Sequence, residues 1–397
     1  MALNPEILIW ARETAGLSID EAAQSLGFKD SRERNASDRL RSIESGEEEP
    51  SRSVLLSMAR VYHRSLLVFY LSAPPRKGDR GQDFRRVPGT ATTAYDPTLD
   101  ALIRDIRGRQ SMVKDLLDQN DSRRIDYVAS VAMDIPPTEL ARRIRDNLGF
   151  SLAEFRRQAT VEAAFNYLRG KVEASGAFVL LLGNLGSYQT NIPSRVFRGY
   201  AIADAVAPFI VVNDQDAHVA WAFTTLHELT HLWLGATGVS GASTDVQLES
   251  YCNNVAGEIL LPEAEMNELR ILRRASLKET ITAVAQFAGK RKVSRAMVAY
   301  KLLLVNIIPV ARWRELDTHY VEEWEAAQAK IVPKEKNEGG PNYYVVKRHR
   351  LGHALLALVK NSLTEGFLTH TKAGQVLGVK PRNVDPLVYA TGMRGGE

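Results

Sequence analysis

Two histidines and a glutamate occur in the pattern His227-Glu228-x-x-His231, in the stretch Leu226–Leu232, which is flanked by apolar residues. On a helix, positions i and i+4 lie on the same face, so both imidazoles can bind one metal ion. Glu228 then stands beside the open coordination position, where a carboxylate can take a proton from water. Because so short a pattern also arises by chance, the flanking sequence has to decide what it means.

A second helix is predicted to begin after the cap residue Asp245. A catalytic zinc takes three protein ligands and keeps one position open, and Glu249 on this helix is the candidate for the third ligand. Asn253 lies one turn later on the same face, where it can hydrogen-bond a ligand histidine. Helical spacing favours Glu249 over the two alternatives for the third ligand, Tyr251 and Glu258.

Together these two stretches resemble the ImmA/IrrE family of zinc metallo-endopeptidases. In that family HELxH is followed by E-x-x-A-N-x-F-A-x-x-L-L-x-P, and this chain reads H-E-L-T-H and then E-S-Y-C-N-N-V-A-G-E-I-L-L-P. The departures, Cys252 for alanine and Val255 for phenylalanine, are small apolar changes on a packing face. The resemblance covers about residues 170–310. It implies a gluzincin-like site in which Glu228 is the general base and Zn²⁺ is held by His227, His231 and Glu249.

The composition is that of an ordinary protein with several cores: 397 residues, of which 45% are hydrophobic and 25% charged. The chain has no apolar run of about eighteen residues and no visible secretory signal, so we expect no membrane span. Cys252 is the single cysteine, which fits a reducing cytoplasm, and we interpret it as a small buried residue. The net charge of +4 permits a local DNA-binding patch without requiring one.

Residues 1–72 are predicted to form a helical domain in which Ser18 and Glu21 make a capping box. The strings R-E-T-A-G-L-S-I-D-E-A-A-Q-S-L-G and I-E-S-G-E-E-E-P-S resemble the phage-repressor-type (Xre-like) helix-turn-helix domain. In such a domain the third helix enters the major groove of DNA. The helices are expected over residues 5–15, 19–26, 36–44 and 54–70.

An insertion between Gly27 and Glu44 sets this segment apart from the usual module. Its basic residues can reach phosphates, or the insertion can move the recognition helix out of register. The acidic residues 47–49 would be repelled by DNA, so a helical protein-interaction module is the alternative. The candidate DNA contacts are Arg32, Arg34, Ser37, Arg39 and Arg41.

The middle of the chain is predicted to hold the peptidase-like domain. Residues 73–96 indicate a linker, and residues 97–330 the domain itself with a helical lead-in. His218 is interpreted as a cap or surface residue, because no spacing rule places it at the metal. Three short β patterns predict a small sheet beside the metal-binding helix: Phe178–Gly183, Phe197–Ala203 and Phe209–Asn213.

The C-terminal segment is predicted to be a separate small unit. Residues 331–342 have the composition of a second linker. Residues 343–397 then show a strand-like stretch at Tyr343–Val346 and a helix-turn-helix pattern further on. We expect this unit to read DNA or to dimerise.

The predicted fold class is therefore α+β and mostly helical, with a minimal zincin-like domain between two helical units. The combination predicts a cytoplasmic DNA-binding regulator whose zinc endopeptidase cleaves a repressor-like protein in a stress, mobile-element or toxin–antitoxin circuit. The alternative is an antitoxin or autorepressor that binds promoter DNA and a toxin from the same operon, with the zinc domain used for binding. Expected partners are DNA, a protein substrate or operon partner and, because palindromic operators bind dimers, a second copy of the chain; no membrane is expected.

Overall fold

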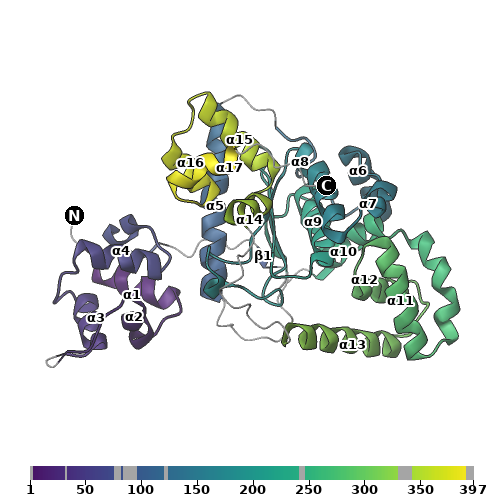
Figure 1. Ribbon diagram of the computed structural model, residues 1–397, viewed down its shortest axis with the longest axis horizontal. Coiled ribbons are helices and arrows are strands. Elements are labelled where there is room, and N and C mark those ends of the chain that lie inside the picture. Colours follow the sequence, from purple (N-terminus) through teal and green to yellow (C-terminus); the bar gives the residue numbers. More distant parts are fainter. Residues whose placement is uncertain are drawn as a thin grey trace. The chain divides into compact units, whose positions relative to one another are not determined.

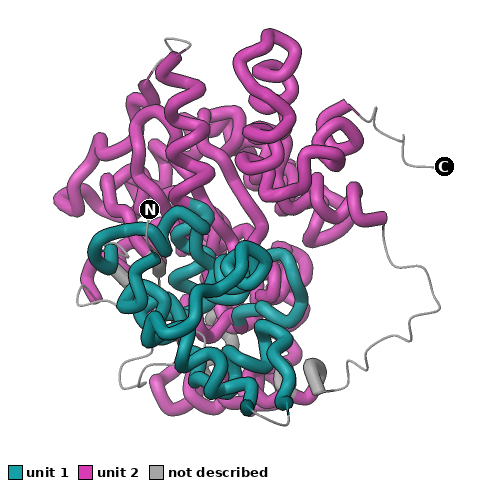
Figure 2. The backbone as a smooth tube through the Cα atoms, turned by 90° about the vertical axis from the view of Figure 1, so that its left-hand side faces the viewer, with its two compact units in different colours: residues 1–80, 89–106, 184–192 teal, residues 81–88, 107–183, 193–397 magenta. Residues whose placement is uncertain are grey.

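The structure is a computed structural model that describes residues 3–31, 34–75, 82–83, 96–119, 124–240, 246–329 and 342–389. It divides into two compact units (Figure 2). The smaller unit holds residues 1–80, 89–106 and 184–192, and the larger holds residues 81–88, 107–183 and 193–397. Arg32, Asp245 and most of the two predicted linkers lie outside the described residues.

The predicted α+β class is confirmed, because helices dominate the described residues and their short strands form one small sheet. No helix of the described part is long and apolar enough to cross a membrane. Beyond the elements introduced below, the helices are α5 Asp96–Gln119, α6 Pro137–Leu148, α7 Leu152–Arg157, η2 Tyr188–Thr190, η3 Glu263–Arg274, α11 Leu277–Arg291, α12 Arg295–Leu304 and α13 Val310–Ala329 (Figure 1).

The described strands follow the order β1-β5-β3-β4-β2 in a single sheet. Strand β4 runs parallel to β2, whereas β3 is antiparallel to both of its neighbours, β4 and β5. The three predicted strands are present, but β1 and β5 were missed, because two or three residues are too few to show an alternating pattern. The strand bounds are β1 Gln82–Asp83, β2 Phe178–Leu181, β3 Gly199–Ile202, β4 Phe209–Val212 and β5 Gly238–Ser240.

Strands β2, β3 and β4 are buried on both faces of the sheet, which explains their nearly continuous apolar sequences. Alternate side chains such as Val179, Ala201 and Ile210 belong to the large core that also contains Leu226 of the helix with the predicted metal ligands. On the other face, the Tyr200 hydroxyl accepts a hydrogen bond of 2.8 Å from the Arg107 guanidinium of α5. The sheet is therefore a middle layer that can hold a helix rigidly on each side.

The central helix α9, His218–Trp233, packs against β3 and β4 and against helices α8 (Val161–Ala174) and α10 (Val246–Leu260) (Figure 1). Every residue from 224 to 233 is buried, as expected for a helix that is apolar all round. Its buried hydroxyls bond to carbonyls one turn back, Thr225 to Trp221 and Thr230 to Leu226, each at 2.8 Å. These two buried hydroxyl groups are thereby satisfied within the helix itself.

The N-terminal segment of the smaller unit contains the predicted short helices. The capping box of Ser18 and Glu21 is present, and a buried ion pair of 2.8 Å between Arg12 and Glu44 joins α1 to α3. The predicted fourth helix divides in two, because His63 adopts a left-handed conformation between the two parts. The bounds are α1 Pro5–Thr14, α2 Ile19–Ser25, α3 Ala36–Ser45, α4 Arg52–Val61 and η1 Leu66–Tyr70.

The strand predicted at Tyr343–Val346 is wrong, since these residues begin helix α14 (Tyr343–Leu351). The Asn342 side chain caps that helix by accepting a hydrogen bond from the Tyr344 amide, and the helix packs against β2. A short run of β-formers is a weak signal, which capping and tertiary packing override here. The chain continues through α15 His353–Thr364, α16 His370–Leu377, η4 Pro381–Asn383 and α17 Val384–Val388.

A buried ion pair on α8 fixes this C-terminal region to the rest of the larger unit. Arg169 and Glu173 lie 3.2 Å apart with side chains only 6% exposed. Arg169 also donates to the carbonyl groups of Val179 in β2 and His349 in α14. Glu173 accepts hydrogen bonds of 3.1 and 3.2 Å from the first amides of α15. The pair thus satisfies backbone groups of three elements at once.

We therefore predict that Glu173→Ala lowers the free energy of unfolding by about 3–5 kcal/mol, because it leaves the Arg169 charge buried and unpaired. Urea denaturation measures the change. The matched control is Glu154→Ala, which removes a carboxylate from an exposed pair with Arg157 and should leave stability unchanged. Equal effects of the two substitutions would contradict the anchoring role of Glu173.

Candidate metal centre

Helices α9 and α10 bring three predicted ligands to one point. The Nε2 atoms of His227 and His231 are 3.0 Å apart. The Glu249 carboxylate lies 3.1 Å from the His231 Nε2 atom and 3.4 Å from that of His227. Both imidazoles are buried, and the Glu249 side chain is only 14% exposed. Within the described residues, these three side chains form a group that could hold a metal ion.

The spacing of the three ligand atoms fits a tetrahedral metal site. Ligands about 2.1 Å from a zinc ion at tetrahedral angles stand roughly 3.4 Å from one another, close to the separations seen here. Burial opposes ionisation of Glu249, but hydrogen bonds from His227 and His231 prevail and lower its pKa to about 2. The carboxylate is therefore in the charged form that binds a cation.

Glu228, the predicted general base, is fully buried and packs against the start of strand β3. A β-carbon on Gly199 would stand 2.7 Å from Glu228 Cδ, which is closer than such atoms approach. Any larger residue at position 199 would therefore force the Glu228 side chain to move. The sequence offered no signal for this contact, because it joins residues far apart in the chain.

The alternatives for the third ligand have other partners. Glu258 pairs with the Lys301 ammonium at 2.8 Å, and the Tyr251 hydroxyl donates to the Ile135 carbonyl at 2.9 Å. The geometry thus favours Glu249. His218 lies at the surface, where its ring contacts the Glu162 carboxylate at 2.6 Å, in keeping with the interpretation as a surface residue.

The surroundings of the histidines differ from the expected ones. Asn253, predicted to hydrogen-bond a ligand histidine, makes no such bond in the described contacts and instead lines a neighbouring pocket. The Cys252 sulfur lies 3.8 Å from His231 Nδ1, within reach of a weak hydrogen bond. Cysteine at this position can therefore help to orient the ring, a role that its apolar surroundings in the sequence did not indicate.

Four of the five candidate DNA-binding residues are described, and all four contact acidic side chains of the same unit. Arg34 and Arg39 share Glu48, at 2.7 and 3.2 Å. Arg41 pairs with Asp38 at 2.6 Å, and the Ser37 hydroxyl hydrogen-bonds Asp20. The described surface of α3 is therefore largely neutralised.

Comparison with known families supports the metal centre. Residues 189–303 match the family model of the IrrE N-terminal-like domain, a Peptidase M78 domain, and this stretch contains all three ligand residues and Glu228. The match spans less than a third of the chain and implies a metallopeptidase. No curated protein and no solved structure matches the chain.

The contact between Gly199 and Glu228 leads to a testable expectation. Gly199→Ala should lower the free energy of unfolding by about 1–3 kcal/mol through overpacking, while the zinc content should equal that of the wild type because the candidate ligand residues are unchanged. Chemical denaturation and zinc stoichiometry measure the two effects. Gly289→Ala is the control, since a β-carbon there meets open space. Unchanged stability in Gly199→Ala would show that Glu228 lies elsewhere.

Proposed function

We propose that the protein is a zinc-dependent endopeptidase that cleaves a regulatory, repressor-like protein. The meeting of His227, His231 and Glu249, with Glu228 next to His227 in the sequence, carries this proposal, because a site used only to bind metal has no need of Glu228. The match to the IrrE N-terminal-like domain supports it. A circuit of stress response, mobile-element control or toxin–antitoxin type fits a peptidase that is joined to a candidate DNA-binding segment.

The residues of the centre have distinct tasks in this proposal. Zinc held by His227, His231 and Glu249 would supply Lewis acidity, which lowers the pKa of water and polarises a carbonyl group. Glu228 takes the proton of the attacking water and delivers it to the departing amide nitrogen. Gly199 leaves this carboxylate its space. Both imidazoles are buried, and an imidazole binds metal in its neutral form.

The proposal is tested with the purified full chain, loaded with zinc and incubated with unfolded casein. Glu228→Gln keeps the size of the side chain and removes the base, so we expect hydrolysis to fall by about 10²- to 10⁴-fold with one zinc still bound. The companion variant His231→Ala should lose both zinc and activity. Casein cleavage by Glu228→Gln at the wild-type rate would exclude Glu228 as the base.

We further propose that the N-terminal helices bind DNA through α3. The side chains that pair Arg34, Arg39 and Arg41 with Glu48 and Asp38 are 30% to 56% exposed, and pairs so close to solvent contribute little, so phosphate oxygens can replace these carboxylates. The same neutralised surface favours the alternative, an antitoxin-like or other protein-interaction module. DNA binding to a palindrome would involve two copies of the chain.

The substitution Glu48→Gln distinguishes DNA binding from protein interaction. It removes the carboxylate that pairs with both Arg34 and Arg39, so both guanidinium groups become available to phosphate. If α3 binds DNA, affinity for a fragment of the protein's own promoter should rise roughly two- to fivefold, as measured by fluorescence anisotropy. Glu6→Gln changes the net charge equally and serves as the control. Absence of DNA binding in all three proteins would favour the protein-interaction module.

A further inference from the structure

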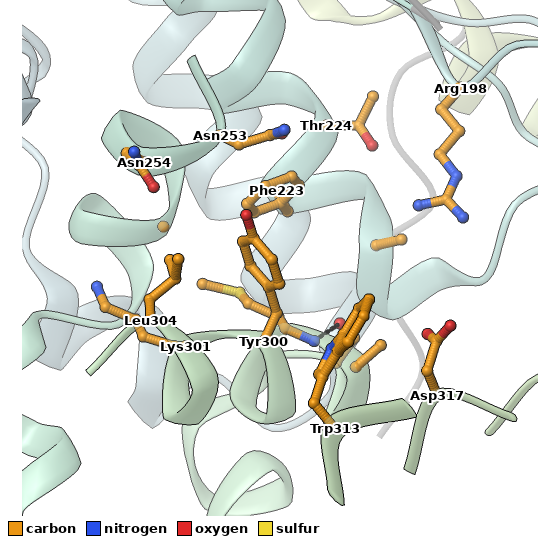
Figure 3. A pocket seen from close by; sticks show the side chains of 15 residues that line it. Arg198, Phe223, Thr224, Asn253, Asn254, Tyr300, Lys301, Leu304, Trp313 and Asp317 are labelled. Carbon is orange, nitrogen blue, oxygen red and sulfur yellow. Dashed lines mark hydrogen bonds between the residues drawn. The ribbon is translucent and has the colours of Figure 1, made fainter. Parts of the chain in front are cut away.

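A pocket of about 270 Å³ lies beside the metal centre and takes no part in the chemistry described above (Figure 3). Its walls come partly from the two helices that carry the ligands. Phe223 and Thr224 of α9 precede His227 and Glu228 by one turn, and the rings of Phe223 and His227 are 6.3 Å apart. Asn253 of α10 follows Glu249 by one turn. A group held in this pocket is therefore adjacent to the metal centre.

The other walls come from α12 and α13 and are largely apolar. The rings of Tyr300 and Trp313 meet edge to face with centroids 6.2 Å apart, and Figure 3 shows both rings facing the pocket together with Phe223. The Lys301 ammonium pairs with Glu258 and donates to the carbonyl of Leu261. These two partners compensate the positive charge of Lys301, so this residue does not make the pocket cationic.

The size of the pocket and the pairing of the sheet both point to a side chain as the occupant. Pockets for drug-sized ligands have volumes of about 300–1,000 Å³, so 270 Å³ suits one large side chain better than a small molecule. Strand β3, which adjoins Glu228, is already paired with both β4 and β5. A substrate cannot add itself as a strand along β3, and recognition there must rely on side chains.

We propose that this pocket receives a large apolar side chain of the protein substrate, of the leucine, methionine or phenylalanine type, next to the bond that is cleaved. The inference rests on the proposed peptidase function. It assigns substrate selection to Phe223, Met297, Tyr300 and Trp313, which bury the side chain. Arg198 and Asp317 also line the pocket, and their charged groups lie to one side of the aromatic rings (Figure 3).

Gly257 on α10 allows the pocket to be filled without disturbing the ligands. It lines the pocket, and a β-carbon built on it meets no atom within 4 Å. Gly257→Leu should therefore occupy the space while the helix is retained, since leucine is a better helix former than glycine. Gly289→Leu is the matched control, because Gly289 also faces open space on a helix but does not line the pocket.

The experiment measures the binding of zinc-directed hydroxamates to the zinc-loaded full chain by calorimetry. Acetyl-leucine and acetyl-glycine hydroxamates sample the acyl side of the cleaved bond, and isobutylmalonyl and malonyl hydroxamates sample the amine side. For one series we expect the wild type to favour the large side chain at least about tenfold. Gly257→Leu should abolish this preference, and Gly289→Leu should retain it.

The outcomes separate the pocket from the peptidase proposal. Zinc uptake with equal affinity for large and small groups in both series would overturn the pocket alone. If Gly257→Leu still binds the hydroxamate with the large side chain more tightly than the small one, the pocket proposal is also overturned. Failure to take up zinc would contradict both proposals. Mass spectrometry of casein fragments provides a second readout, in which a large apolar residue should recur at one fixed position beside the cleaved bonds of the wild type.

Discussion

Two buried imidazoles whose Nε2 atoms stand 3.0 Å apart are the constraint on which the larger unit depends. Lone pairs at this separation repel each other unless a proton or a cation lies between them. The Glu249 carboxylate, with its pKa held near 2, adds negative charge in the same buried place. Groups of this kind are costly in an apolar interior unless they are paired, and a metal ion pairs all three. A metal ion bound by these three side chains would therefore also stabilise the fold.

The rest of the larger unit follows from the need to hold α9 in place. A helix that carries two ligands at i and i+4 must not rotate, and burial on all sides prevents rotation. Strands β3 and β4 support one side of it, while α8 and α10 support the others. Close packing also has a chemical consequence, because only glycine at position 199 leaves the Glu228 carboxylate its space. The packing that holds α9 in place thus also positions the Glu228 side chain.

The C-terminal region and helix α3 differ in how their charged side chains are paired. In the C-terminal region, Arg169 and Glu173 are buried and fully engaged with backbone groups, which suits a structural anchor. On α3, the arginines that resemble DNA contacts pair with acids at the surface, where exchange for another anion costs little. The first arrangement resists change, whereas the surface pairs can exchange one anion for another at little cost.

Local sequence was sufficient where short-range physics decides the structure. The spacing of His227 and His231 placed two ligands on one helical face, Ser18 and Glu21 formed their capping box, and the apolar runs at 178 and 209 became buried strands. The assignment of Glu249 relied on helical periodicity together with a family resemblance. These features depend on neighbours within a few positions, so the order of residues specifies them.

Long-range packing settled what local patterns left open. The ion pair between Glu258 and Lys301, which gives the alternative ligand another partner, joins residues far apart in the chain. The helix at Tyr343, the role of Gly199 and the pocket between α9, α10, α12 and α13 arise from contacts between residues far apart in the chain. Such contacts depend on how elements pack in space, and no periodicity or composition records them. The sequence therefore predicted which side chains form the candidate site, whereas the tertiary structure determined which residues surround them.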